Sequence, residues 1–285
     1  MANHRKVYLE ITNKCNLSCA FCPGTDRAPR ALDEAEFSFL ASRVSDWAEY
    51  LYYHLMGEPT AHPLLPKFIE IATSLGMRSV ITTNGTLLGR RGDDLISSRP
   101  HKVSISLHSF EANELGRSFE EYIASCVAFA RAASNAGIIV ALRLWNLDGK
   151  ADGALNQKNE LILKALRAAF PGDRRRTRSG EALSERVFLE WGEKFDWPDA
   201  DSGDERDTGF CYALRDQIGI LCDGSVVPCC LDRNGELALG NLFSDGLEDI
   251  LASPRARAIY DGFTSHRCVE ALCRHCMRSG YYRQK

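Results

Sequence analysis

The stretch Glu10-Ile-Thr-Asn-Lys-Cys15-Asn-Leu-Ser-Cys19-Ala-Phe-Cys22 places three cysteines in a CX3CX2C pattern directly after a strand-like run, residues 7–11. Thiolates are soft ligands that suit iron–sulfur clusters. Three cysteines can bind three irons of a [4Fe–4S] cubane and leave the fourth iron open to an outside ligand. Zinc is the alternative for the triad alone, but a structural zinc site normally has a fourth protein ligand, and this loop offers none.

Outward from this loop, strand-like and helix-like segments alternate through the first two thirds of the chain. We expect helices at residues 33–44, 64–75, 119–135 and 156–169. We expect strands at residues 7–11, 50–56, 79–83, 103–107, 138–144 and 187–191. Repeated strand–helix units of this length predict an α/β fold with a parallel sheet and right-handed crossovers. Six strands suit a partial, open (β/α)6 barrel better than a closed barrel of eight units.

The pattern changes after an acidic stretch, residues 199–207, which we interpret as a linker. Residues 217–221 and 225–227 flank a turn at Asp223-Gly224 and predict a hairpin. A short helix is expected at residues 247–251. We therefore expect two domains, a barrel over residues 1–198 and a small hairpin and helix domain over residues 199–285.

Composition excludes several function classes. The formal net charge of −3 gives no global basic field, so a nucleic-acid partner is not expected. We find no apolar signal segment and no apolar run of the roughly 18 residues that a membrane span needs, so we expect no membrane partner and a cytoplasmic location. One local basic run is interpreted as a solvated loop; it comprises Arg174, Arg175, Arg176 and Arg178.

Eleven cysteines are present, and ten of them fall into two groups near the ends of the chain. In a reducing compartment, clustered cysteines indicate metal binding or catalysis rather than disulfides. Cys126 stands alone in a helix-like run and is interpreted as a buried apolar residue.

The N-terminal part resembles the radical S-adenosylmethionine (SAM) superfamily. The CX3CX2C loop after the first strand carries the resemblance, together with Phe21 before the third cysteine and Gly57-Glu58-Pro59 after the second strand. The resemblance implies that Cys15, Cys19 and Cys22 hold the SAM-binding [4Fe–4S] cluster. It also implies that Phe21 lies near the adenine and that Gly57, Glu58 and Pro59 bind the methionine amino group.

Further polar residues follow the third, fourth and fifth strands. Asn84 ends the third strand, where it could meet the ribose, although Asn84-Gly85 could also be an ordinary turn. Ser104, Ser106 and His108 alternate along the fourth strand, and Ser106 resembles the superfamily's ribose or carboxylate contact. Arg143 lies in an apolar strand and needs an anionic partner, either the methionine carboxylate or a structural salt bridge.

The second cysteine group resembles the SPASM and twitch extensions of the superfamily. Cys211, Cys229, Cys273 and Cys276 match the single-cluster twitch arrangement of the butirosin-pathway dehydrogenase, which implies an auxiliary [4Fe–4S] cluster with no open iron. Cys222, Cys230 and Cys268 are interpreted as structural, with two alternatives: that Cys268 is a ligand, or that a spare thiol acts in catalysis. A zinc ribbon is the alternative for the whole group.

The resemblance implies an enzyme that cleaves SAM to a 5′-deoxyadenosyl radical and abstracts a hydrogen atom from its substrate. Our first hypothesis is an oxidative, dehydrogenase-like reaction in which the auxiliary cluster takes the second electron and His108, Glu190 or Glu193 takes the proton. A flavodoxin- or ferredoxin-like reductant is the expected partner of a small-molecule or peptide substrate. The alternatives are a maturase of a ribosomal peptide or RNA, and a non-enzymatic zinc or iron–sulfur scaffold.

Overall fold

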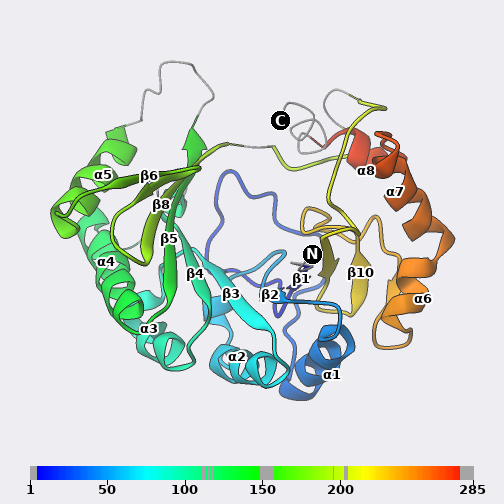
Figure 1. Ribbon diagram of the computed structural model, residues 1–285, viewed down its shortest axis with the longest axis horizontal. Helices are drawn as coiled ribbons and strands as arrows, with labels where there is room; N and C mark the ends of the chain where they lie inside the picture. The colour runs from blue at the N-terminus through cyan, green and yellow to red at the C-terminus, as the bar shows by residue number, and fades with distance from the viewer. Residues whose placement is uncertain are drawn as a thin grey trace.

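A sheet of six parallel strands forms the centre of the protein, and the computed structural model describes residues 5–110, 113, 116, 118–147, 157–194, 196–201 and 205–276. The six strands are β1 Lys6–Leu9, β2 Tyr50–Tyr52, β3 Arg78–Thr83, β4 Lys102–Ser106, β5 Ile139–Leu147 and β8 Val187–Glu193. Each pairs in parallel with the next. Figure 1 shows the strands as an arc with its helices on the outer side. Among the described residues the sheet ends at β11 and β6 without closing, which confirms a partial barrel.

Five helices connect these strands and cover the outer face. They are α1 Glu34–Val44, α2 Leu65–Ser74, α3 Leu88–Ser97, α4 Phe119–Asn135 and α5 Gln157–Ala169. Asp33 and Glu36 form a capping box that starts α1. The rings of Phe37 on α1 and Phe68 on α2 stack 4.1 Å apart, so the two helices share one core with the sheet.

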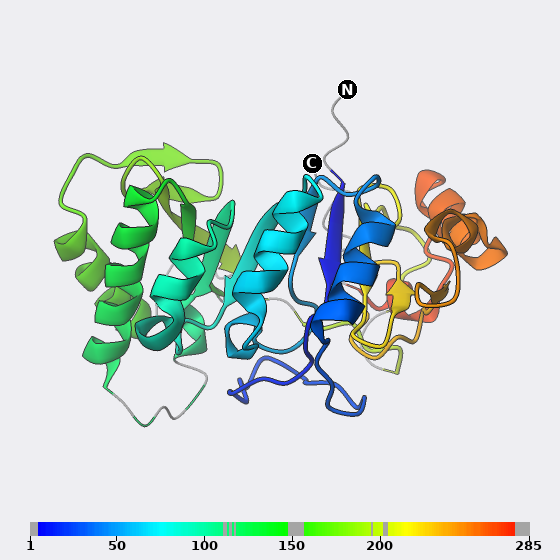
Figure 2. The same cartoon turned by 90° about the horizontal axis from the view of Figure 1, so that it is seen from below.

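The C-terminal part continues the same sheet. Strand β9, Gln217–Ile220, pairs in parallel with β1, and β10, Ser225–Val227, pairs with β9 as the predicted antiparallel hairpin. Strand β11, Gly240–Asn241, completes this edge. The helices α6 Leu247–Ala252, α7 Pro254–Thr264 and α8 Ala271–Arg274 follow. Figure 2 shows this part beside α1, at the opposite side of the sheet from α4 and α5.

Several elements differ from the sequence-based expectation. Strand β2 ends at Tyr52 rather than residue 56, because the Met56 N–H donates to the Glu10 carboxylate (3.1 Å) instead of to a neighbouring strand. Helix α3 was not expected, since it contains two glycines and few apolar residues. Packing explains it, because Gly92 lies against the Phe129 ring of α4, where a Cβ would come within 3.1 Å.

Part of the arginine run also forms a strand rather than a loop. Strand β6, Arg175–Thr177, pairs with β7, Gly180–Ala182, and β7 pairs with β8. This edge hairpin depends on pairing with β8, which a polar local sequence does not reveal. Helix α7 was also not expected from the sequence. The start of the helix expected at residue 156 and part of the linker expected at residues 199–207 lie outside the described residues. No helix among the described residues is long and apolar enough to span a bilayer.

Candidate functional site

The CX3CX2C cysteines lie on the long loop that joins β1 to α1, at the carboxyl end of the parallel strands. Figure 2 shows this loop projecting beyond the end of β1. Cys15 and Cys22 are exposed and Cys19 is half-buried. Although Cys15 is exposed at the surface, partial desolvation of its sulfur raises the pKa of the thiol, and the neighbouring Cys19 and Cys22 raise it further. Three mutually adjacent thiols on one accessible loop fit an iron–sulfur cluster, which binds each thiolate to a different iron.

A single metal ion fits less well. In the described part of the chain, no three His, Cys, Asp or Glu side chains converge tightly enough to hold one ion. A zinc site needs such convergence on one centre, whereas a cubane spreads its ligands over four irons.

Gly57 lets the end of the second strand approach the cysteine loop closely. Its φ is +78°, and a Cβ there would lie 2.2 Å from the Thr12 carbonyl oxygen, so only glycine fits without movement. The next residue, Glu58, donates its backbone N–H to the Lys14 carbonyl at 2.9 Å. The Gly57-Glu58-Pro59 segment is therefore joined to the residue that precedes Cys15.

The Glu58 side chain is buried, and its carboxylate already accepts several hydrogen bonds. The donors are the Thr60 N–H (3.0 Å), the Thr60 hydroxyl (2.6 Å) and the Asn84 N–H (2.7 Å). Burial raises the pKa of this carboxyl group, and these donors act in the opposite direction. Asn84 in turn donates its side-chain N–H to the Asn16 oxygen at 2.9 Å. One network thus connects Glu58, Asn84 and the cysteine loop.

The predicted adenine and strand-end residues lie together at the same end of the barrel. The rings of Phe21 and His108 are 5.1 Å apart. His108 is buried in the short 3-10 helix η2, Leu107–Ser109, so the expected alternation along β4 stops at Ser106. Ser106 pairs in register with Arg143 on β5.

Arg143 and Glu190 form an ion pair. Arg143 Nε donates to Glu190 Oε2 at 3.2 Å, and Lys102 Nζ donates to Glu190 Oε1 at 2.8 Å. Burial acts to raise the pKa of Glu190, but the two cations outweigh it and hold that pKa below its usual range. The structural salt bridge is thus present for Arg143, and Glu190 is already committed to two partners. Glu193 is exposed at the end of β8.

A row of polar side chains, each with a buried atom that has no hydrogen-bond partner, crosses the inner face of the sheet. Thr82 pairs in register with Ser104, and Ser104 with Ala141. His54 follows Tyr52, which pairs with Val80, so His54 lies next to this row. Within the described residues, His54 Nδ1, Thr82 Oγ1 and Ser104 Oγ are buried and have no hydrogen-bond partner. Buried polar groups are normally satisfied, so unpartnered atoms on β3, β4 and the segment after β2 make this face a candidate ligand position.

Aromatic side chains border this row. The rings of Tyr8 and Tyr52 stack 4.6 Å apart, and His54 lies edge-on to Tyr8 at 5.7 Å. Burial lowers the pKa of His54 to about 3, and Arg143 contributes in the same direction. The imidazole is therefore neutral at pH 7. Tyr8 and Cys230 pack against the same small cluster of Leu55, Leu221 and Val227, and burial together with Cys230 raises the pKa of the Tyr8 phenol.

The distal cysteines gather beside this end of the barrel. Cys211 precedes β9, Cys229 follows β10, and Cys273 and Cys276 lie in and after α8. Burial raises the pKa of the Cys211 thiol to about 11, and it also raises the pKa values of Cys229 and Cys273 well above their usual range. Neighbouring cysteines of this group add to each of these three shifts, because a thiolate is disfavoured beside another thiolate. Four clustered thiols fit a fully ligated [4Fe–4S] cluster.

The three spare cysteines separate in space. Cys268 and Cys230 lie next to the distal group. Cys222 lies instead with Glu10 and Arg27, whose Nη1 donates to its sulfur at 3.8 Å. Cys126 lies on the core-facing side of α4 and is buried, as expected for an apolar role.

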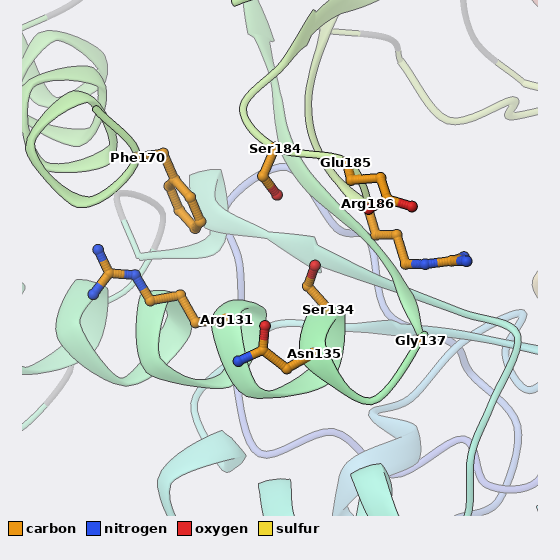
Figure 3. A pocket seen from close by; sticks show the side chains of 8 residues that line it. All are labelled: Arg131, Ser134, Asn135, Gly137, Phe170, Ser184, Glu185 and Arg186. Carbon is orange, nitrogen blue, oxygen red and sulfur yellow. The ribbon is translucent and has the colours of Figure 1, made fainter. Parts of the chain in front are cut away.

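A surface hollow of about 600 Å³ lies at the opposite end of the barrel. Figure 3 shows its lining, with Arg131, Ser134 and Asn135 on α4 facing Phe170 and the segment before β8. It contains no cysteine and none of the predicted site residues. The chemistry-bearing residues are at the carboxyl ends of the strands, so we place no site in this hollow.

Sequence reasoning missed some residues of this arrangement. Tyr8, His54 and Thr82 were not singled out, although each has the strand parity that points to the inner face. Lys102 was missed because its partner Glu190 is far away in the sequence. Asn113, which donates to Cys19, lies in a polar loop with no local signal.

Comparisons with known proteins agree with this geometry. The family model described as "Radical SAM superfamily" matches residues 9–154, more than half of the 285-residue chain. The model described as "Iron-sulfur cluster-binding domain", SPASM, matches residues 211–277.

Curated relatives include proteins with different named roles. The chain is 25% identical over 95% of its length to the Bacillus subtilis antilisterial bacteriocin subtilosin biosynthesis protein AlbA. It is 33% identical over 37% of its length to the Chlorobaculum tepidum GTP 3′,8-cyclase. These matches cover 65% and 33% of the two relatives, so the chain spans less than two thirds of either.

Solved structures share the fold at low sequence identity. BtrN in complex with AdoMet and 2-DOIA has a TM-score of 0.61 and 17% identity, over 96% of this chain and 92% of BtrN. AnSMEcpe with bound AdoMet has a TM-score of 0.62 and 15% identity, over 98% and 94% of the two chains. Streptococcus suis SuiB has a TM-score of 0.62 and 16% identity, over 90% and 67%.

Proposed function

The chain belongs to the radical SAM superfamily, and we propose that it catalyses an oxidative, dehydrogenase-like radical reaction with the help of an auxiliary cluster. It is an enzyme with a SPASM iron–sulfur domain, and its cofactors are [4Fe–4S] clusters and S-adenosylmethionine. Bound together, these cofactors supply a 5′-deoxyadenosyl radical that takes a hydrogen atom from the substrate. We keep the division into a barrel, residues 1–198, and an auxiliary domain, residues 199–285, as part of the proposal.

The first cofactor site would use the cysteine loop and the network behind it. Cys15, Cys19 and Cys22 would hold the cluster that binds SAM. The SAM site would be lined by Phe21, Gly57, Glu58, Pro59, Asn84, Ser106 and Arg143. The Glu58 carboxylate and the backbone hydrogen bond from Glu58 to Lys14 support this, because they fix the loop relative to the strand ends. Arg143 would act there through the free part of its guanidinium, since Nε is bound to Glu190.

The unpartnered row of His54, Thr82 and Ser104 marks where the substrate would bind. All three groups are neutral hydrogen-bonding groups, and in the nearby Arg143–Glu190–Lys102 set one carboxylate is shared by two cations, which leaves one positive charge. A substrate that presents hydroxyl or amide groups would satisfy these atoms.

One observation carries the oxidative outcome. Tyr8, on the inner face of the barrel, and Cys230, the residue after Cys229, pack against the same apolar cluster. The distal cysteines would therefore lie near the proposed substrate position. Cys211, Cys229, Cys273 and Cys276 would hold an auxiliary cluster with no open iron, which suits it to accept the second electron. Of the three predicted bases, His108 is favoured, because Glu190 is committed to two cations and Glu193 is exposed.

Anaerobic reconstitution tests the proposal. The protein should bind iron and sulfide, and with SAM and a low-potential reductant it should release 5′-deoxyadenosine. A zinc-bound protein that makes no 5′-deoxyadenosine would contradict the proposal. The oxidative outcome requires a product that has lost two hydrogens relative to the substrate. We propose a flavodoxin- or ferredoxin-like electron donor and a cytoplasmic location, which suits eleven cysteines without disulfides.

A peptide maturase is the second candidate. The match to AlbA along 95% of the chain favours it. The neighbouring genes discriminate the two, because a precursor-peptide gene favours maturation and a small-molecule pathway favours dehydrogenation. The matching assay adds the encoded peptide and looks by mass spectrometry for a cross-link or another loss of hydrogen.

A further inference from the structure

Asn113 reaches across from the end of η2 to the cysteine loop. Its side-chain Nδ2 donates to the Cys19 sulfur at 3.1 Å and to the Ser109 carbonyl at 2.7 Å. Its Oδ1 accepts from the Ser18 N–H at 3.1 Å. One side chain therefore connects the fourth strand's end to two consecutive residues of the CX3CX2C loop.

The orientation of this amide is fixed by its partners. The Ser18 backbone N–H can only donate, so it must face the amide oxygen, and the Ser109 carbonyl can only accept, so it must face the amide nitrogen. A flipped amide would lose both bonds. The second N–H of Asn113 is then left facing the Cys19 sulfur, and both of its protons are used.

An N–H that faces a thiolate sulfur stabilises negative charge on that sulfur. Reduction of an iron–sulfur cluster adds negative charge that the ligand sulfurs share, and hydrogen bonds to those sulfurs are one determinant of cluster potential. The bond to Ser18 also holds the backbone next to Cys19 in place, so the donor does not depend on a freely moving loop.

We propose that Asn113 is a positioning residue that orients Cys19 and makes the SAM-binding cluster easier to reduce. The inference rests on the proposed role of Cys19 as a ligand of that cluster. It adds a residue outside the cysteine motif that tunes the first electron transfer.

The test compares midpoint potentials of reconstituted full-length variants by EPR-monitored redox titration. The signal that changes on addition of SAM identifies the cluster in question. Asn113→Leu keeps a similar volume but has no donor, and Asn113→Asp keeps the acceptor for Ser18 while it replaces the donor with a carboxylate. Asn135→Leu removes an exposed amide at the opposite end of the barrel and is the matched control.

We expect Asn113→Leu to make this cluster about tenfold harder to reduce, which for a one-electron couple lowers the midpoint by about 59 mV. Asn113→Asp should lower it further, because an anion then lies beside the sulfur, and Asn135→Leu should leave it unchanged. Wild-type potentials in both Asn113 variants, at full iron content, would overturn the inference. If Asn113→Leu binds no iron, Asn113→Asp alone decides, and an unchanged potential in it is sufficient to overturn the inference.

Failure of the proposed function looks different. In that case the wild-type protein itself has no cluster signal that responds to SAM. A responsive wild-type signal that is insensitive to Asn113 rejects only the present inference.

Discussion

Replacing Gly57 with alanine should break the connection between the second strand and the cysteine loop, and Gly76 offers a matched control. The two glycines have nearly the same backbone, with φ of +78° and +80°. An alanine in this left-handed region costs roughly 1–2 kcal/mol at either position. A Cβ at Gly76 meets nothing within 4 Å, whereas a Cβ at Gly57 meets the Thr12 carbonyl oxygen at 2.2 Å.

The difference between the two variants therefore isolates the steric clash. To restore an ordinary contact of 3.4 Å, the Gly57 or Thr12 backbone must move by about 1 Å. That movement strains the bond from the Glu58 N–H to the Lys14 carbonyl, 2.9 Å, immediately before Cys15. We expect Gly57→Ala to lose SAM binding and much of the iron at the triad.

Gly76→Ala should bind iron and SAM as the wild type does. Its only expected change is a lower thermal midpoint. A loss of roughly 1–2 kcal/mol, at about 2–4 °C for each kcal/mol, gives a decrease of roughly 2–8 °C. Iron content, SAM binding by calorimetry and thermal unfolding are measured for both. If Gly57→Ala matches Gly76→Ala in all three, the close approach of the two segments has no role in cofactor binding and the reasoning fails.

Three further outcomes are expected. Arg27→Ala removes the 2.7 Å ion-pair partner of the fully buried Glu10 carboxylate and should lower the free energy of urea unfolding by roughly 3–5 kcal/mol. The control Lys67→Ala breaks an exposed pair and should lower it by less than about 1 kcal/mol. Equal losses in the two variants would contradict the burial argument. The pKa of His54 is about 3 in the folded state, so between pH 6.5 and pH 3 only the unfolded state binds a proton there. The free energy of unfolding should therefore decrease by up to about 1.4 kcal/mol for each unit by which the pH is lowered in this range. His54→Gln should remove that slope between about pH 7 and about pH 5, and an unchanged slope would show that His54 is not its source. Cys211→Ala should lower iron from about eight to about four per chain and abolish the oxidised product while SAM cleavage continues; full turnover would reject the auxiliary role.

The local sequence was sufficient to predict an element where its hydrophobic pattern agrees with the capping or turn residues at its ends. Helix α4 begins after a Ser118 capping box and ends before Gly137, and its bounds match the expected residues 119–135. The hairpin of β9 and β10 likewise follows from its turn at Gly224, whose φ is +86°. Such elements carry their start and stop signals within a few residues.

The missed elements depend on distant partners. Helix α3 exists because Gly89 and Gly92 let it approach α4, and neither the glycines nor the charges of this segment favour a helix by themselves. The sequence could not identify Glu190 as the partner of Arg143 for the same reason, because only the register of β5 and β8 brings the two side chains together. Motifs placed the cysteines in the sequence, but only the fold brings Tyr8 and Cys230 into contact.

The pairing of β1 with β9 has a consequence for biosynthesis. Strand β1 is synthesised long before β9, so one of its two edges stays unpaired until residues 217–220 have been made. Domains usually fold as they are synthesised, and such long-range strand pairing forms late. The strand that leads into the cysteine loop therefore gains both of its strand neighbours only after β9 has been translated. Insertion of iron into the nascent protein should follow, rather than precede, completion of the C-terminal part.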